Sequence, residues 1–332
     1  MKMQAIVGML LAVCIGVSLV ACGGREPIKD TASKVEGRQA RPLRILVVGC
    51  DDAASLCDVM LLLKLSDTGA DIVQLPRDTY ASYTKGSYRK LNGALRTLGD
   101  MPSLCSFLED TLGTDIDGYV RMDTEAFCSV VDAVGGVTVT LPCEMRYTDP
   151  EQGLTIALPA GEQHLDGERA LQFVRFRSAY VRGDLGRLDA QKIFLSAFLR
   201  QVRERLTPMG TIRLVCSLMG KLHTDLSVAE AISAVRRGLA LPPSQVRMVT
   251  LPGQDAQMRS GAWFYFVSRP SALKVIREHI DGDVTEECFD TDRVLCSGSM
   301  SSYYGEEVCY TVHTAEEANT EGIEIERTKK AS

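Results

Sequence analysis

Four arginines gather in a short segment that joins one apolar helical pattern to the next. Guanidinium groups hold phosphate oxygens through paired hydrogen bonds, and the N-terminus of a helix favours an anion. The aspartate of this segment precedes the second helix and can cap it, and a glutamine follows the last arginine by one helical turn. The segment therefore predicts a phosphate site made of Arg175, Arg177, Arg182, Asp184, Arg187 and Gln191. The alternative is a solvated basic face that pairs with Glu168 or Asp189.

Two aspartates stand at the ends of apolar runs. Asp51 follows the run that ends at Gly49, and Asp58 opens the run that begins at Val59. Carboxylates at the end of a buried sheet suit a hard cation, and Mg²⁺ takes one or two carboxylates together with phosphate oxygens. Asp51 and Asp58 are therefore the predicted metal ligands. The alternative for Asp51 is an Asx-turn after a strand.

Two shorter motifs add groups that can bind phosphate or substrate. Arg77 follows an apolar run, where it can reach a phosphate or pair with Asp78. Lys90 and Asn92 stand just before a helical pattern. We expect both to contact substrate, and the alternative for Asn92 is an ordinary helix N-cap.

Motifs for covalent catalysis or for a P-loop are absent from the sequence. It contains no G-x-S-x-G segment, no paired Cys and His, and no Walker motif. Chemistry at a phosphate ester needs none of these, because a metal ion and arginines can stabilise the developing charge while a substrate hydroxyl attacks.

The N-terminus has the features of an export signal. Lys2 is followed by an apolar run from Ala5 to Ala21, and Leu19–Cys22 resembles the lipobox of bacterial lipoproteins, whose cysteine carries a diacylglyceryl group. We predict a signal peptide over residues 1–22, lipid attachment at Cys22, and a flexible tether over residues 23–42. The alternative is an uncleaved membrane anchor. Both place the rest of the chain outside the cytoplasm, at the membrane.

Charge and cysteine usage narrow the class of protein. Residues 283–332 contain twelve acidic and four basic side chains, so the tail carries −8 and the preceding residues carry +2 of the net −6. A body this weakly basic does not favour nucleic acid as a partner. The cysteines form no C-x-x-C pair, which argues against zinc. A disulfide among Cys288, Cys296 and Cys309 stays open.

Strand and helix patterns alternate from Leu43 to Gly282. We therefore expect the α/β class: one α-β-α layered domain over residues 43–282, with a mostly mixed or antiparallel central sheet between helices. The strands expected at 59–65 and 71–76 are joined by a short turn and should form a hairpin. Residues 159–165 are expected to be a loop, and Gly186 to about Leu206 a long amphipathic helix. Residues 283–332 form an acidic, cysteine-containing tail that we expect to be largely disordered.

Several motifs, in this order and spacing, resemble those of the LytR-CpsA-Psr family of extracytoplasmic cell-wall enzymes. The resemblance covers about Leu43 to Ile280. It rests on Leu46–Asp51, Leu75–Thr79, Lys90–Asn92, Val131–Val137, Gly167–Arg177 and Gly183–Arg187, with Gln191.

The resemblance implies a Mg²⁺-dependent phosphotransferase. It would move a phosphoglycan, such as a teichoic acid or a capsular polysaccharide, from undecaprenyl diphosphate to peptidoglycan. By matching positions, Asp51 and Asp58 would face Mg²⁺, and the polyprenyl tail would lie in an apolar tunnel. Asp184 or a metal-side aspartate would take the proton of the acceptor hydroxyl. The groups around the diphosphate would be Arg77, Arg175, Arg177, Arg187 and Gln191.

The sequence departs from the family pattern at three places. Leu56-Cys57-Asp58 lacks the arginine that the family usually has beside its second aspartate, for which Arg182 or Lys90 could compensate. Ala190-Gln191 replaces Arg-Gln, and the lipobox replaces the usual transmembrane anchor. The missing arginine motivates an alternative function, a polyprenyl (di)phosphate-binding protein or pyrophosphatase without ligase activity.

Overall fold

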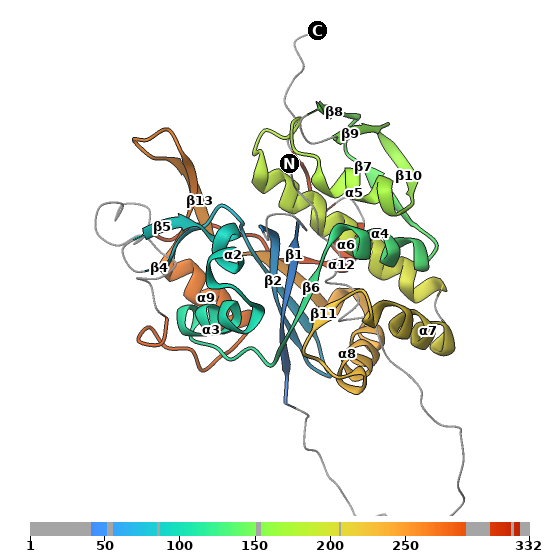
Figure 1. Ribbon diagram of the computed structural model, residues 1–332, viewed down its shortest axis with the longest axis horizontal. Coiled ribbons are helices and arrows are strands. Elements are labelled where there is room, and N and C mark those ends of the chain that lie inside the picture. The colour runs from blue at the N-terminus through green and yellow to red at the C-terminus, as the bar shows by residue number, and fades with distance from the viewer. Residues whose placement is uncertain are drawn as a thin grey trace, which may run out of the picture.

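The computed structural model describes residues 41–51, 56–84, 87–150, 154–205, 207–289, 306–319 and 322–325. Its centre is a seven-stranded mixed sheet in the order β11-β6-β1-β2-β3-β12-β15 (Figure 1). β1 pairs antiparallel with β2 and parallel with β6, and β3 pairs antiparallel with β2 and parallel with β12. The strands are β1 (Leu43–Cys50), β2 (Cys57–Leu65), β3 (Ala70–Leu75), β6 (Gly118–Met122), β11 (His223–Thr224), β12 (Val246–Thr250) and β15 (His313–Thr314).

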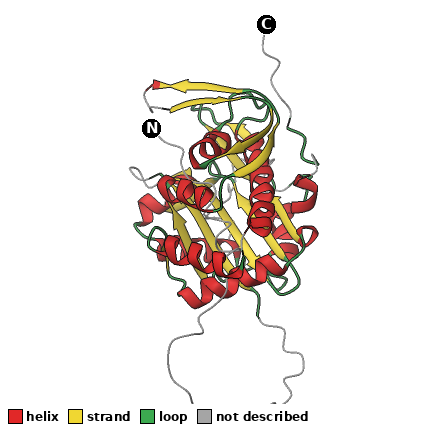
Figure 2. Ribbon diagram, turned by 90° about the vertical axis from the view of Figure 1, so that its right-hand side faces the viewer, coloured by secondary structure: helices red, strands yellow, loops and turns green. Residues whose placement is uncertain are grey.

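Helices cover both faces of this sheet, which confirms the expected α-β-α layers (Figure 2). Alternate side chains of β1 enter two separate cores, Ile45 and Val47 on one face, Leu46 and Val48 on the other. This explains why the strand is apolar throughout. One core packs on α2 (Ala94–Leu98), α3 (Met101–Leu112) and α9 (Arg269–His279). The other packs on α4 (Thr124–Ala133), α5 (Gly167–Arg175), α6 (Asp184–Arg205), α7 (Pro208–Met219) and α8 (Val228–Ala240).

Side-chain caps set the starts of several helices. Ser227 caps α8 in a capping box with Glu230, and Asp166 caps α5 by accepting from the backbone N–H of Arg169. Asp123 caps α4 by accepting from the backbone N–H of Ala126.

In the described part of the chain, four two-stranded ribbons and two 3-10 turns accompany the central sheet. β7 pairs with β10 antiparallel, so the loop expected over residues 159–165 is wrong. The sequence patterns also missed the other ribbons, whose register depends on tertiary neighbours. The ribbons are β4 (Tyr80–Thr84) with β5 (Ser87–Lys90), β7 (Val137–Leu141) with β10 (Gly161–Leu165), β8 (Met145–Asp149) with β9 (Leu154–Leu158), and β13 (Gly253–Gln257) with β14 (Trp263–Val267). The 3-10 turns are η1 (Leu91–Gly93) and η3 (Pro243–Gln245).

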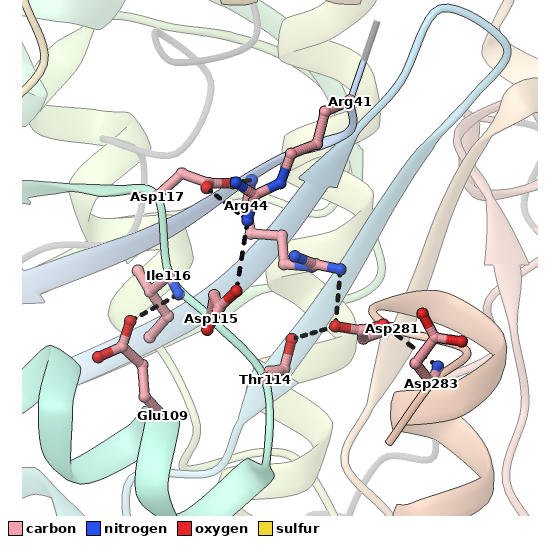
Figure 3. A network of polar contacts seen from close by, with 9 residues as sticks. All are labelled: Arg41, Arg44, Glu109, Thr114, Asp115, Ile116, Asp117, Asp281 and Asp283. Atoms are coloured by element: carbon pink, nitrogen blue, oxygen red, sulfur yellow. Dashed lines mark hydrogen bonds and ion pairs between the residues drawn. The ribbon is translucent and has the colours of Figure 1, made fainter. Parts of the chain in front are cut away.

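A polar network holds the N-terminal end of β1 (Figure 3). Arg44 donates to the Asp281 carboxylate at 2.7 Å, and Thr114 donates to the same oxygen at 3.1 Å. The backbone N–H of Arg44 donates to Asp117 at 2.7 Å. Since strands rise about 3.3 Å per residue, this end of β1 lies roughly 25 Å from the end that carries Asp51.

The acidic tail is not disordered throughout, which corrects the prediction. β15 pairs antiparallel with β12 at the sheet edge, and α12 (Ala315–Asn319) packs against α6. Ala315, Ala318, Ile323 and Ile325 are buried in the core that includes α6. The two-residue strand and five-residue helix are too short to give a periodic pattern, so the sequence alone did not reveal them. Residues 290–305, 320–321 and 326–332 of the tail lie outside the described ranges.

The predicted signal peptide, Cys22 and almost all of the tether also lie outside the described residues. Among the helices that are described, none is long and apolar enough to cross a membrane.

Candidate functional site

The two predicted metal aspartates lie at the same end of two paired strands. Cys50 and Cys57 are register partners across β1 and β2, and each is followed by one of the aspartates. Asp51 is fully buried and Asp58 is 3% exposed. The backbone N–H of Asp51 donates to the carbonyl of Leu56 at 3.1 Å, which ties the two strand ends together. The strand pairing therefore brings both carboxylates to one edge of the sheet.

Arg77 links these strands to α6. It follows β3, and its Nη1 donates to Oδ1 of Asp58 at 2.8 Å, while its Nε lies 3.3 Å from Oδ1 of Asp184. Burial alone would lower the pKa of Arg77, but the carboxylates of Asp184, Asp58 and Asp78 outweigh it and raise that pKa. Arg77 is therefore held as a charged cation between three carboxylates.

Arg187 lies one turn into α6 and is completely buried. Its Nη2 lies 2.8 Å from Oδ1 of Asp184. Burial lowers the pKa of Arg187 to about 10, although Asp184 opposes that shift. Asp184 is the first residue of α6, two residues before the expected start, and its carboxylate lies between Arg77 and Arg187. It bridges the two arginines, and the expectation of a simple helix cap missed this role.

Packing of α6 on the sheet fixes Arg187 in place. Gln74 of β3 donates from Nε2 to the carbonyl of Leu188 at 3.3 Å, and it accepts from the Thr250 hydroxyl at 3.0 Å. A Cβ on Gly186 would meet the side chain of Tyr180 at 2.7 Å, so only glycine permits this close approach. Fourteen of the 22 residues of α6 are buried, hence the helix is enclosed rather than amphipathic as predicted.

Two buried polar side chains of the site have no partner among the described residues. Arg175 ends α5 and is 8% exposed, yet its guanidinium makes no hydrogen bond or ion pair there, and its Nε is buried without one. Burial lowers the pKa of Arg175, and Asp58 opposes this. Gln191 is 3% exposed, and both its amide nitrogen and its amide oxygen are buried without a partner. Because buried polar groups are almost always hydrogen-bonded, both point to a polar ligand.

The remaining predicted residues lie around this centre. Arg177 is exposed, and its charge contributes to the lowered pKa of Arg187, so the two are close. Lys90 lies 3.0 Å from Asp78 and over the ring of Phe264.

Arg182 lies further out than the other predicted arginines. Its side chain is 57% exposed and sits 3.6 Å from Asp189, which is the ion pair that the alternative reading proposed for this segment.

Asn92 does not cap a helix. It lies inside η1, and α2 starts after Gly93 with no side-chain cap. Its backbone N–H donates to the carbonyl of Arg77 at 2.9 Å, which places it next to the site. The N-cap alternative is therefore wrong, and a substrate contact by Asn92 stays a prediction.

One further acid lies at the site and could not be predicted from the sequence. Asp255 of β13 lies opposite Tyr265 of β14, and the backbone N–H of Tyr265 donates to the carbonyl of Asp78 at 2.9 Å. Partial burial raises the pKa of Asp255 to about 6, helped by the negative charges of Asp184 and Asp78. In Figure 1 the ribbon that contains β13 projects beside β4 and β5. Only this tertiary pairing brings Asp255 to the site.

The two aspartates fit a magnesium ion that is completed by phosphate oxygens. Oδ2 of Asp58 is buried with no hydrogen-bond partner in the described part of the chain, and burial raises the pKa of this carboxyl. A bound cation would neutralise the charge on that oxygen. No group of three or more His, Cys, Asp or Glu side chains capable of holding a metal occurs among the described residues. Mg²⁺ would therefore need oxygens from a bound phosphate compound, which it commonly uses.

A cavity of about 550 Å³ lies on the far side of α6 from these groups. It is lined by β7, by α6 and by the C-terminal segment around Ile323. None of the charged residues described above lines it. The apolar tunnel for a polyprenyl chain stays a prediction.

Comparisons with known proteins show which family and which solved folds the chain resembles. The model of the LytR_cpsA_psr family matches residues 22–280. The chain is 26% identical over 268 residues to the polyisoprenyl-teichoic acid–peptidoglycan teichoic acid transferase TagV of Bacillus subtilis (strain 168), covering 75% of this chain and 67% of that protein.

Solved structures show the same fold. The crystal structure of B. subtilis TagV aligns with a TM-score of 0.62 at 25% identity, over 72% of this chain and 97% of that one. A structure of TagT bound to LI-WTA aligns with a TM-score of 0.58 at 25% identity, over 77% and 95% of the two chains.

Proposed function

The chain belongs to the LytR_cpsA_psr family, and we propose that it transfers an anionic glycopolymer from a polyprenyl diphosphate carrier to peptidoglycan. The observation that carries this proposal is the unpartnered pair Arg175 and Gln191, buried beside the carboxylate and arginine network of Asp58, Arg77 and Arg187. A diphosphate would supply the oxygen partners that Arg175 and Gln191 lack among the described residues. The names of the relatives support the same donor and acceptor.

The arginines would divide the work of holding the diphosphate. Among the described residues Arg175 has no partner to give up, so its guanidinium is available to the ligand. Arg187 is buried with a lowered pKa, so a neighbouring anion would stabilise its charge. Arg177 is exposed at the rim and can meet the outer phosphate. Gln191 can donate from its amide nitrogen and orient a phosphate oxygen.

Asp51 and Asp58 would hold Mg²⁺ against the same phosphates, and the ion would neutralise charge on the diphosphate. Arg77 keeps Asp58 in place through its 2.8 Å hydrogen bond. The family usually has an arginine next to this aspartate in the sequence. In this chain Arg77 is the arginine that contacts Asp58. Lys90 and Arg182, which the sequence offered as substitutes, pair instead with Asp78 and Asp189.

The reaction would be an attack by an acceptor hydroxyl on the sugar-proximal phosphorus. A new phosphorus–oxygen bond forms to the acceptor, and the bond to the bridging oxygen breaks, so polyprenyl phosphate leaves with that electron pair. The carboxylate of Asp184 already contacts both Arg77 and Arg187. Asp255 has a pKa of about 6 and no hydrogen-bond partner among the described residues, so we assign the proton to it.

The protein would act at the outer face of the bacterial membrane, anchored through lipid on Cys22, with peptidoglycan as its acceptor. The export signal in residues 1–22 supports this location. Changing Cys22→Ser should move the protein from the membrane fraction to the soluble fraction. A Cys22→Ser protein that still carried diacylglycerol, or a wild-type protein without it, would refute lipid attachment at this residue.

The experiment that tests the activity measures polyprenyl phosphate released from a synthetic lipid-diphosphate glycan, with and without Mg²⁺. We expect release only with Mg²⁺ and faster release when peptidoglycan is present. The matched variants are Arg175→Met in the site and Arg236→Met on the exposed face of α8. A protein that binds the lipid with no release is a sequestering protein, and release to water alone marks a pyrophosphatase. In cells without the protein, mass spectrometry of peptidoglycan should show the loss of a phosphodiester-linked polymer.

A further inference from the structure

Two buried cysteines face each other, and each directly precedes one of the two aspartates proposed to bind Mg²⁺. Cys50 is the last residue of β1, Cys57 is the first of β2, and their Sγ atoms lie 3.4 Å apart. Cys50 is 1% exposed and Cys57 is fully buried. Both are free thiols in this structure.

The backbone places this pair within the range that a disulfide requires. Cys50 and Cys57 are Cα partners in the antiparallel register of β1 and β2. Such partners lie about 4.5–5.5 Å apart between Cα atoms, and disulfides span about 4.4–6.8 Å. A bond needs the sulfurs at about 2.05 Å, which small rotations of the two side chains can supply without moving the strands.

The position of the pair ties it to the site. Asp51 follows Cys50 directly, and Asp58 follows Cys57 directly. The strand pairing is irregular at this point, with a shift of register between Gly49 and Cys50. The regular ladder of hydrogen bonds between β1 and β2 is interrupted at this point. A covalent link here would fix the two strand ends and, with them, the two carboxylates.

We propose that Cys50 and Cys57 form a disulfide in the exported protein, and that this bond holds the two metal aspartates in place. Exported proteins mature under oxidising conditions, in which neighbouring thiols pair. One thiolate attacks a protein or small-molecule disulfide, and the other then displaces the mixed disulfide. Two electrons and two protons pass to the oxidant, which leaves as two thiols.

The bond is tested on the full chain isolated from an oxidising compartment, with free thiols alkylated under denaturing conditions. Trypsin releases both cysteines in one peptide, residues 45–64, because Arg44 and Lys64 flank it. We expect this peptide to be lighter by two hydrogen atoms and to carry no alkyl group. The proposal would be overturned if this peptide carried two alkyl groups, both in the protein as isolated and after incubation of the native protein with oxidised glutathione.

The role of the bond is tested by reduction. Closing so short a loop should raise Tm by about 5–10 °C, so reductant should lower Tm by that amount. It should also weaken the binding of Mg²⁺ with inorganic diphosphate in calorimetry. The double variant Cys50→Ala, Cys57→Ala is the control, in which reductant changes neither quantity. A reduced wild-type protein with unchanged Tm and unchanged binding would refute the role, even with the bond present. The peptide mass is independent of any transferase activity.

Discussion

Removing the charge of Arg175 should reduce activity and stabilise the fold. The side chain is 8% exposed, has no hydrogen bond or ion pair among the described residues, and has a pKa that burial lowers. Its desolvation is therefore only partly compensated in the free protein, by the charge of Asp58. Replacing such a buried charge by an apolar side chain of similar volume should stabilise the protein by about 1 kcal/mol. Arg175→Met should then raise Tm by about 2–4 °C.

The same change removes one contact to the diphosphate. A hydrogen bond to a charged group contributes about 1.5–3 kcal/mol, which corresponds to a loss of roughly 10- to 150-fold in kcat/KM. Arg77→Met is the matched control within the site. In the wild-type protein the guanidinium of Arg77 lies 2.8 Å from the carboxylate of Asp58 and 3.3 Å from that of Asp184. Arg77→Met removes this partner from both carboxylates. Breaking such a buried pair costs about 3–5 kcal/mol, so its Tm should fall by about 6 °C or more.

The assay is differential scanning calorimetry of both variants, together with the release of polyprenyl phosphate at saturating acceptor. Opposite signs of the Tm change, with activity reduced in both, are the expected result. The reasoning is refuted if Arg175→Met keeps kcat/KM within about twofold of wild type. It is also refuted if the Tm of Arg175→Met falls as far as that of Arg77→Met.

Four further changes test other parts of the account. Asp255 must be ionised to accept a proton, so wild-type kcat/KM should fall as pH falls through about 6, and Asp255→Asn should lose that limb of the profile; an unchanged profile removes Asp255 from the reaction. Asp58→Asn should weaken Mg²⁺ binding in calorimetry at least tenfold, whereas equal binding places the ion elsewhere. Phe194→Ala empties a fully buried position and should lower the free energy of unfolding by about 3–5 kcal/mol in urea; a loss below about 1 kcal/mol contradicts the described core. Ala318→Glu puts a charge into the contact of α12 with the core and should expose the C-terminal segment to proteases; wild-type resistance would show that the segment is held without this contact.

The strands and helices that repeat a clear hydrophobic pattern were predictable from the sequence. The hairpin of β2 and β3 and the α-β-α layers are confirmed because both depend on local spacing and burial. The ribbons that frame the site were not predictable, since β13 and β14 are stabilised by contacts with Tyr80 and with the backbone of Asp78. The packing of the C-terminal segment, residues 313–325, was not predictable either. The acidic composition of the tail indicates its charge, but it does not indicate which few residues are buried.

The residue types of the site were readable from the sequence, and their partners were not. Arg77, Arg175 and Arg187 look alike as sequence, each a basic residue at the end of an element. The structure separates them by their surroundings: carboxylates raise the pKa of Arg77, and burial lowers the pKa of Arg175 and Arg187. Asp184 looked like a helix cap and bridges two arginines instead. Asp255 could not be found, because only the β14 pairing with the segment after β3 brings it to the site.

The most direct test of the proposed function is a reconstituted transfer with the full chain, a lipid-diphosphate glycan, peptidoglycan and Mg²⁺. Mass spectrometry of the digested peptidoglycan and of the lipid fraction follows both products of one reaction. The account predicts equal amounts of polyprenyl phosphate and of peptidoglycan fragments that carry the glycan through a phosphodiester, and much less of both with Arg175→Met. Intact lipid diphosphate recovered bound to the protein, with unmodified peptidoglycan, would contradict it.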